Sequence, residues 1–133
     1  MPTRILFVDD HEMNRHIVRG MLEVAGLSMD EAPSAELGLR MIDREDYDLV
    51  LMDLRMPGMD GLAALREIRG RSDAKAKVPV VMLTGDACQD INRAVRDAGG
   101  NDMVHKPIIM ENLFDAITRV LFNTEAQAEF AIA

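Results

Sequence analysis

The chain has 133 residues, of which 48% are hydrophobic and 29% are charged, and these values suit one soluble globular domain. Its net charge of −8 argues against nucleic acid as a direct partner, because phosphate backbones repel an acidic surface. The only cysteine, Cys88, excludes an internal disulfide, and no apolar run approaches the roughly 20 residues of a membrane span. We therefore expect a cytoplasmic protein that binds neither nucleic acid nor membrane.

Four short apolar segments, each closing on polar residues, predict buried strands. They cover residues 5–8, 49–52, 80–83 and 103–105, and the polar residues that follow them are Asp9 and Asp10, Asp53, Thr84, and Lys106. Because their apolar residues are continuous rather than alternating, these strands should be covered on both faces, as in parallel sheets. A weaker strand is expected over residues 28–31, and Asn101 with Asp102 should form the turn into the last strand.

Amphipathic helical patterns fill the intervals between these strands and follow the last one. Ser34 is placed to cap one helix, and Gly26, Gly70 and Gly99 are placed to end three others. Alternation of strand and helix predicts a doubly wound α/β fold with a five-stranded parallel sheet and five helices. We expect one domain over residues 1–123, followed by a flexible tail over residues 124–133.

The polar residues at the strand ends should meet at one edge of this sheet, where doubly wound folds bind their ligands. Asp9, Asp10 and Asp53 would gather there with Thr84 and Lys106. Carboxylates packed together repel one another, so the cluster predicts a cation, and oxygen ligands favour Mg²⁺. A nucleophilic carboxylate, a metal, a hydroxyl and a lysine are the groups that aspartyl-phosphate chemistry needs.

The segments FVDD, LVLMDLRMPGMDG, VVMLTGDA and GGNDMVHKPI occur in this order, and together they resemble a response-regulator receiver domain of two-component signalling. The resemblance runs from about Arg4 to Phe122. It implies a single-domain protein of the chemotaxis-regulator type, with a flavodoxin-like sheet in the strand order 2-1-3-4-5. It also implies that a histidine kinase or a histidine phosphotransfer protein supplies a phosphoryl group.

The resemblance also implies roles for individual residues. Asp53 matches the phosphoacceptor, Thr84 the hydroxyl that bonds the phosphoryl group, and Lys106 the lysine that pairs with it. The bond from Lys106 to Pro107 matches a peptide bond that is typically cis in the family. Met103 stands where the family usually has Tyr or Phe, so the aromatic switch of other receivers is not implied here.

The implied Mg²⁺ site uses the same cluster of acids. Asp10 matches a direct metal ligand, Asp9 an acid that acts through a water molecule, and Arg55 a residue whose backbone carbonyl binds the metal. Asp53 would complete the ligand set. His11 follows the acid pair, and a surface position is its simpler interpretation, with a contact to the metal as the alternative.

Three other functions match parts of the pattern less well. A phosphatase with an aspartyl nucleophile would need an acid two residues after it, where this chain has Arg55. A nucleotide switch would need a G-x-x-x-x-G-K-[ST] loop, which the sequence lacks. A module that binds proteins without being phosphorylated would have no reason to retain the acids, Thr84 and Lys106.

We therefore expect a phosphorylatable response regulator rather than a turnover enzyme. Phosphorylation would change its affinity for a downstream protein target, and it would act as a monomer or weak dimer. We also expect Arg55 and Asp86 to flank the opening of the site and to tune the lifetime of the aspartyl phosphate. The sequence leaves open whether the chain is a stand-alone regulator, a phosphorelay shuttle or the excised receiver of a hybrid kinase.

Overall fold

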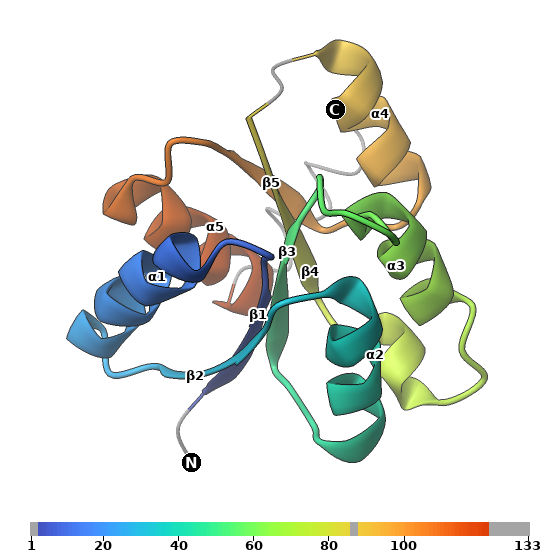
Figure 1. Ribbon diagram of the computed structural model, residues 1–133, viewed down its shortest axis with the longest axis horizontal. Coiled ribbons are helices and arrows are strands. Elements are labelled where there is room, and N and C mark those ends of the chain that lie inside the picture. Colours follow the sequence, from blue (N-terminus) through green and yellow to red (C-terminus); the bar gives the residue numbers. More distant parts are fainter. Residues whose placement is uncertain (1–2, 86–87, 123–133) are drawn as a thin grey trace.

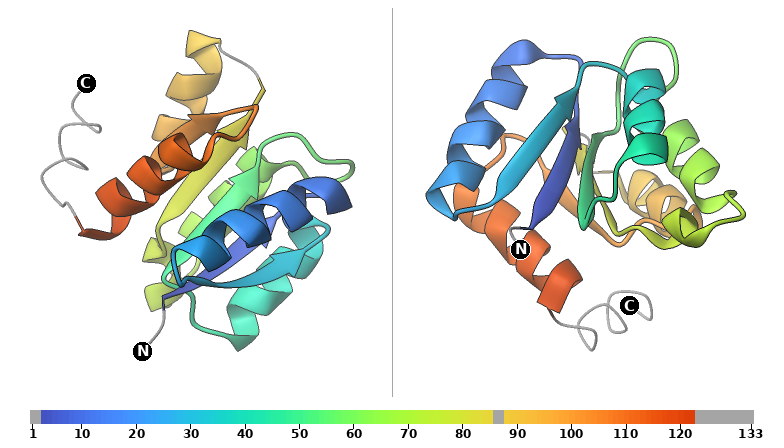
Figure 2. Two further views of the ribbon diagram at one scale, coloured as in Figure 1. Left: turned by 90° about the vertical axis from the view of Figure 1, so that its left-hand side faces the viewer. Right: turned by 90° about the horizontal axis from the view of Figure 1, so that it is seen from below.

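The computed structural model describes residues 3–85 and 88–122. Within these residues, five parallel strands form one sheet in the order β2-β1-β3-β4-β5, with α-helices on both faces (Figure 1, Figure 2). This arrangement confirms the predicted doubly wound fold and its flavodoxin-like strand order. The tail predicted over residues 124–133 lies outside the described residues.

The secondary structure follows the predicted alternation of strands and helices. The strands are β1 (Arg4–Val8), β2 (Ser28–Ala32), β3 (Leu49–Asp53), β4 (Val80–Thr84) and β5 (Asp102–His105). The helices are α1 (Glu12–Val24), α2 (Ala35–Arg44), α3 (Gly61–Arg69), α4 (Gln89–Asp97) and α5 (Met110–Phe122), with a short 3-10 helix at Ala74–Lys77. None of these helices combines the length and hydropathy that would let it cross a membrane.

Successive residues of the central strands supply two separate hydrophobic cores. Leu6 and Val8 of β1 pack on the side covered by α2, α3 and α4, whereas Ile5 and Phe7 pack on the side covered by α1 and α5. Figure 1 shows α1 and α5 on one side of the sheet and the other helices opposite them. Because helices cover both faces, every position in these strands can be apolar, which explains the continuous apolar runs.

The last strand begins earlier than the sequence indicated. Asp102 was expected in the turn before β5, but it is the first residue of the strand and is only 8% exposed. Its carboxylate accepts hydrogen bonds from Nε and Nη2 of Arg119 in α5, at 2.9 and 2.7 Å. This charge-assisted pair from a distant helix allows an acid to be buried at the start of the strand.

The loop after β3 returns the chain to the end of that strand, where Gly61 begins α3. Asp60 caps this helix by accepting a hydrogen bond from the Ala63 N–H at 2.8 Å, and the Gly61 N–H donates to the Leu54 carbonyl at 2.8 Å. A Cβ atom on Gly61 would lie only 2.2 Å from the carbonyl oxygen of Asp53. Only glycine therefore lets α3 approach the backbone of Asp53 so closely.

We expect Gly61→Ala to lower the free energy of unfolding by about 2–3 kcal/mol, because the backbone of either α3 or Asp53 must move to accommodate the methyl group. Gly20→Ala is the matched control, since Gly20 lies within α1 and an added Cβ would meet nothing within 4 Å. That control should raise the stability by about 0.5–1 kcal/mol through helix propensity. Urea denaturation followed by circular dichroism measures both, and equal stabilities for Gly61→Ala and wild type would contradict the close approach.

Candidate functional site

The strand register brings the polar strand ends to one edge of the sheet. Val8, the last residue of β1, pairs with Met52 of β3. Asp9 and Asp53 are the residues that follow this pair. Thr84 ends β4 and is paired with His105, the residue before Lys106. The Lys106 N–H donates to the Thr84 carbonyl at 2.7 Å, which extends this pairing beyond the strands. The predicted convergence of strand-end residues is therefore present.

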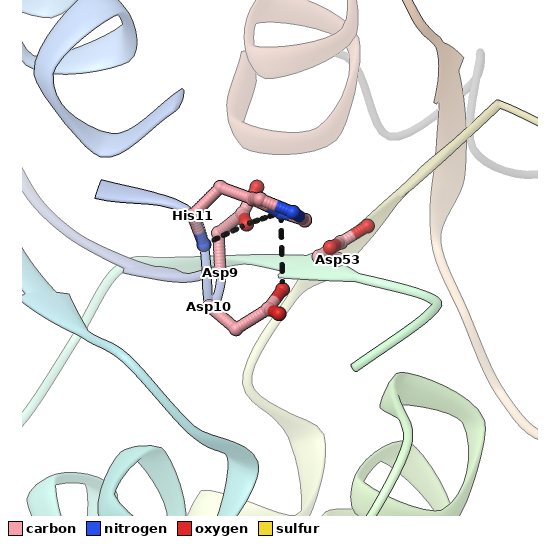
Figure 3. A group of neighbouring side chains, drawn as sticks. All are labelled: Asp9, Asp10, His11 and Asp53. Atoms are coloured by element: carbon pink, nitrogen blue, oxygen red, sulfur yellow. Dashed lines mark hydrogen bonds and ion pairs between the residues drawn. The ribbon is translucent and has the colours of Figure 1, made fainter. Parts of the chain in front are cut away.

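Three carboxylates and one imidazole surround a common space at this edge (Figure 3). Asp9 is 0% and Asp53 is 2% exposed, whereas Asp10 is partly exposed and His11 lies at the surface. Each of these residues offers one possible ligand atom, and the four atoms lie within 4.8 Å of one another. The acids are therefore close enough to share one cation.

Asp9 is held in place by the first turns of α1. The backbone N–H of His11 donates to its Oδ1 at 2.8 Å, and the Asn14 amide donates to its Oδ2 at 3.2 Å. Arg15 donates to the Asp9 carbonyl oxygen at 2.7 Å. Sequence reasoning missed Asn14 and Arg15, whose only signal is that polar residues follow the acid pair by about one helical turn.

Asp53 has two carboxylate oxygens in different environments. Its Oδ1 accepts a hydrogen bond from Lys106 Nζ at 2.9 Å, and the same nitrogen lies 3.8 Å from Asp9 Oδ2. Its Oδ2 is buried and receives no hydrogen bond from the residues described, and the same is true of Asp10 Oδ1. Two buried carboxylate oxygens that lack donors are suited to binding a cation.

The pKa of Asp53 reflects its burial with only one hydrogen-bond donor among the described residues. Burial raises the pKa of its carboxyl group above the ordinary value, and the neighbouring Asp9 and Asp10 raise it further. The hydrogen bond and the positive charge of Lys106 act in the opposite direction. One lysine therefore does not offset both the burial and the two neighbouring acids, and a hard dication with oxygen ligands fits the remaining negative charge.

A cavity of about 350 Å³ opens over Asp53. Thr84 and Lys106 line it from β4 and from the residue after β5, and Arg55 lines it from the loop after β3. Thr84 is 2% exposed, whereas Arg55 lies at the surface. The cavity therefore brings the predicted phosphoacceptor, hydroxyl and lysine together, while Asp86, which is predicted to flank the opening with Arg55, lies outside the described residues.

Two further features lie near the lysine, of which the first agrees with the resemblance and the second departs from it. The peptide bond between Lys106 and Pro107 is cis. Met103 of β5 is half-buried and packs against the core on the side of α2, α3 and α4. A thioether therefore stands where the resemblance leads one to expect an aromatic ring.

A family model described as the response regulator receiver domain matches residues 5–118. The chain therefore belongs to the response regulator receiver domain family. This finding agrees with the fold, with the acid cluster that can bind a metal ion, and with the resemblance in the four sequence segments.

Two similar proteins show how this domain occurs in chains of different length. The sensory/regulatory protein RpfC of Xanthomonas campestris is 36% identical over 126 residues, which are 94% of this chain and 17% of RpfC. The two-component response regulator ORR41 of Oryza sativa subsp. japonica is 38% identical over 114 residues, covering 83% of this chain and 87% of ORR41. The chain thus spans a small part of one relative and most of the other.

One similar solved structure contains a metal. It is the receiver domain of the sensor histidine kinase PA1611 from Pseudomonas aeruginosa PAO1, with a magnesium ion in its active-site cleft. Its TM-score is 0.82 at 31% identity, and the match covers 91% of this chain and 98% of that one.

Replacing Asp10 should separate charge repulsion from metal binding. Without a divalent metal, Asp10→Ala is expected to raise the free energy of unfolding by about 1 kcal/mol, because one of three crowded carboxylates is removed. Added Mg²⁺ should stabilise the wild type and have little effect on the variant. Thermal melts in EDTA and in Mg²⁺ measure both effects.

Glu12→Ala is the control for this experiment, because Glu12 is an exposed acid in the first turn of α1. Its removal should not stabilise the protein, since an acid at a helix N-terminus is favourable. If Asp10→Ala melts no higher than wild type in EDTA, the acids do not repel one another as described.

Proposed function

We propose that this chain is a phosphoacceptor response regulator, which receives a phosphoryl group from a phosphohistidine onto Asp53 and thereby changes its binding to another protein. The observation that carries the proposal is the environment of the Asp53 carboxylate. Lys106 holds one oxygen through a hydrogen bond, and the other oxygen receives no hydrogen bond from the described residues. Asp53 also lines a cavity. A carboxylate with one oxygen held and one available is suited to act as a nucleophile.

In the proposed reaction, a carboxylate oxygen of Asp53 attacks the phosphorus atom, and the phosphorus–nitrogen bond to the donor histidine breaks. The electron pair of that bond stays on the imidazole nitrogen, and a proton on the other ring nitrogen lets the donor leave as neutral imidazole. Mg²⁺ held by Asp9, Asp10 and Asp53, with the Arg55 carbonyl as a further ligand, would offset negative charge on the phosphoryl oxygens. Lys106 would pair with one of these oxygens.

Signalling would follow from the positions of Thr84 and Lys106 at the ends of adjacent strands. A phosphoryl group on Asp53 would recruit the Thr84 hydroxyl and the Lys106 ammonium, both of which line the cavity. Movement of either residue would be passed to β4 and β5 and to the helices that follow them. The phosphoryl group would thus favour one of two arrangements of this face and change its affinity for a partner.

We further propose that the donor is a histidine kinase or a histidine phosphotransfer protein and that the reaction takes place in the cytoplasm. The relatives support this context, since they include a sensory/regulatory protein and a two-component response regulator. The chemistry is the same in a stand-alone regulator and in the receiver of a hybrid kinase. In both cases the chain serves as a phosphorylated switch rather than as a turnover enzyme.

The proposal predicts that acetyl phosphate with Mg²⁺ phosphorylates the wild type and not Asp53→Asn, because the amide is not a nucleophile in this reaction. Asp60→Asn is the matched control, since Asp60 caps α3 and Asn caps helices equally well. Intact-protein mass spectrometry measures the gain of a phosphoryl group. Equal labelling of Asp53→Asn and wild type would rule out Asp53 as the acceptor.

Lys106→Ala is expected to accept some phosphoryl group but to lose most of the structural response. Phosphorylation-induced NMR shifts of β5 and α5 amides measure that response for each variant. Met103→Ala should retain more of this structural response than Lys106→Ala, because Lys106 donates a hydrogen bond to Asp53 and the Met103 thioether does not. Lys77→Ala, at an exposed position, should behave as wild type. Equal losses in the Lys106 and Met103 variants would contradict this assignment.

Arg55 lines the cavity through which water must reach the phosphorus atom. We expect Arg55→Ala to shorten the half-life of the phosphorylated protein several-fold, which corresponds to about 1 kcal/mol in the barrier to hydrolysis. The decay of labelled protein after removal of the phosphodonor provides the measurement, with Arg66→Ala as an exposed control on α3. An unchanged half-life in Arg55→Ala would show that Arg55 does not limit access.

A further inference from the structure

His11 lies beside the acid cluster although neither helix capping nor the proposed phosphoryl transfer requires its imidazole. It occupies the N-cap position of α1, but its side chain makes no capping hydrogen bond. Its Nδ1 lies 3.2 Å from Asp10 Oδ1 and 3.4 Å from Asp9 Oδ1. Figure 3 shows the ring over the two acids, on the same side as Asp53. The imidazole nitrogen is therefore beside the space that a cation bound by the acids would occupy.

The spacing of the four groups is suited to a first coordination sphere. Metal–ligand bonds of about 2.1 Å separate neighbouring ligand atoms by about 3 Å and opposite ones by about 4.2 Å. The possible ligand atoms of Asp9, Asp10, His11 and Asp53 lie within 4.8 Å of one another, so a closure of a few tenths of an ångström suffices.

A second observation, beyond the closeness of the acids, concerns two of their oxygen atoms. The Asp53 side chain is 3% exposed, and its Oδ2 is buried and receives no hydrogen bond from any described residue. Asp10 Oδ1, the oxygen nearest to the imidazole, is also buried without a hydrogen bond from those residues. A shared cation would bind these two oxygens and the imidazole nitrogen together.

We propose that His11 Nδ1 is a ligand of the metal in this site, and that it thereby strengthens the preference of the site for imidazole-binding dications such as Ni²⁺ over Mg²⁺. The inference rests on the metal site of the proposed function but adds a ligand and a metal preference to it. Carboxylate and carbonyl oxygens suit Mg²⁺, whereas an imidazole nitrogen adds affinity for Ni²⁺, Cu²⁺ and Zn²⁺. Because His11 is largely exposed, it can complete the ligand set without unfolding any packed element.

Direct binding measurements test this assignment. The tag-free full chain, stripped with EDTA, is titrated calorimetrically with Ni²⁺ and separately with Mg²⁺, as the wild type, His11→Gln and His16→Gln. His16 lies exposed on the same helix and serves as the matched control. We expect His11→Gln to lower the ratio of Ni²⁺ affinity to Mg²⁺ affinity by at least about tenfold, and His16→Gln to leave it unchanged.

A spectroscopic measurement identifies the ligand atom. With ¹⁵N-labelled histidine, diamagnetic Zn²⁺ should shift the Nδ1 resonance of His11 far more than Mg²⁺ does, and it should leave the His16 resonances in place. The inference is overturned if His11→Gln keeps the wild-type affinity ratio, if both glutamine variants lose it equally, or if Zn²⁺ leaves His11 Nδ1 unshifted.

These outcomes remain distinct from a failure of the proposed function. If Asp53 accepts no phosphoryl group while Ni²⁺ binding depends on His11, the proposed function fails and the metal preference stands. If Asp53 is phosphorylated with Mg²⁺ while the affinity ratio of His11→Gln is that of wild type, the metal preference alone is wrong.

Discussion

Two carboxylates, Asp9 and Asp53, are buried side by side at the end of a parallel sheet, and the surrounding site offsets the unfavourable energy of that burial. Moving a carboxylate out of water costs several kcal/mol unless donors or cations replace the lost hydration. The helix α1 supplies donors to Asp9, and Lys106 supplies one to Asp53 at 2.9 Å. Asp53 Oδ2 receives none from the described residues, and this leaves the site incomplete without a further positive charge.

This incomplete compensation connects the structure to the proposed function. A site with two buried carboxylate oxygens that receive no hydrogen bond from the described residues responds strongly to a cation or a phosphoryl group, because either changes the charge balance where little water screens it. Thr84 and Lys106 would meet the charge of a phosphoryl group, and they are joined by the hydrogen bond from the Lys106 N–H to the Thr84 carbonyl. A charge added at Asp53 is therefore felt by two neighbouring strands together. His11 lies at the surface of the same cluster and would influence which cation offsets the negative charge of the carboxylates.

Most of the fold could be predicted because it depends on local patterns. Parallel strands covered on both faces need continuous apolar residues, and the segments that end at Val8, Met52 and Leu83 show this directly. Gly61 and Asp102 show the limit of such reasoning. In the sequence, Gly61 is one glycine among nine, and its role appears only when α3 lies against the Asp53 backbone. Asp102 resembled a turn residue because its partner, Arg119, lies on a distant helix.

The sequence by itself determined which chemical groups would reach the sheet edge, because a parallel sheet carries the residue after each strand to the same side. It thereby identified Asp9, Asp53, Thr84 and Lys106 before any coordinates. Only the tertiary structure decided which Asp53 oxygen Lys106 holds, which oxygens lack donors, and that the His11 imidazole lies over the acids. Those features depend on side-chain directions and on distances between segments far apart in the chain. Such distances follow from the packing of whole helices and strands, which no local pattern of residues encodes.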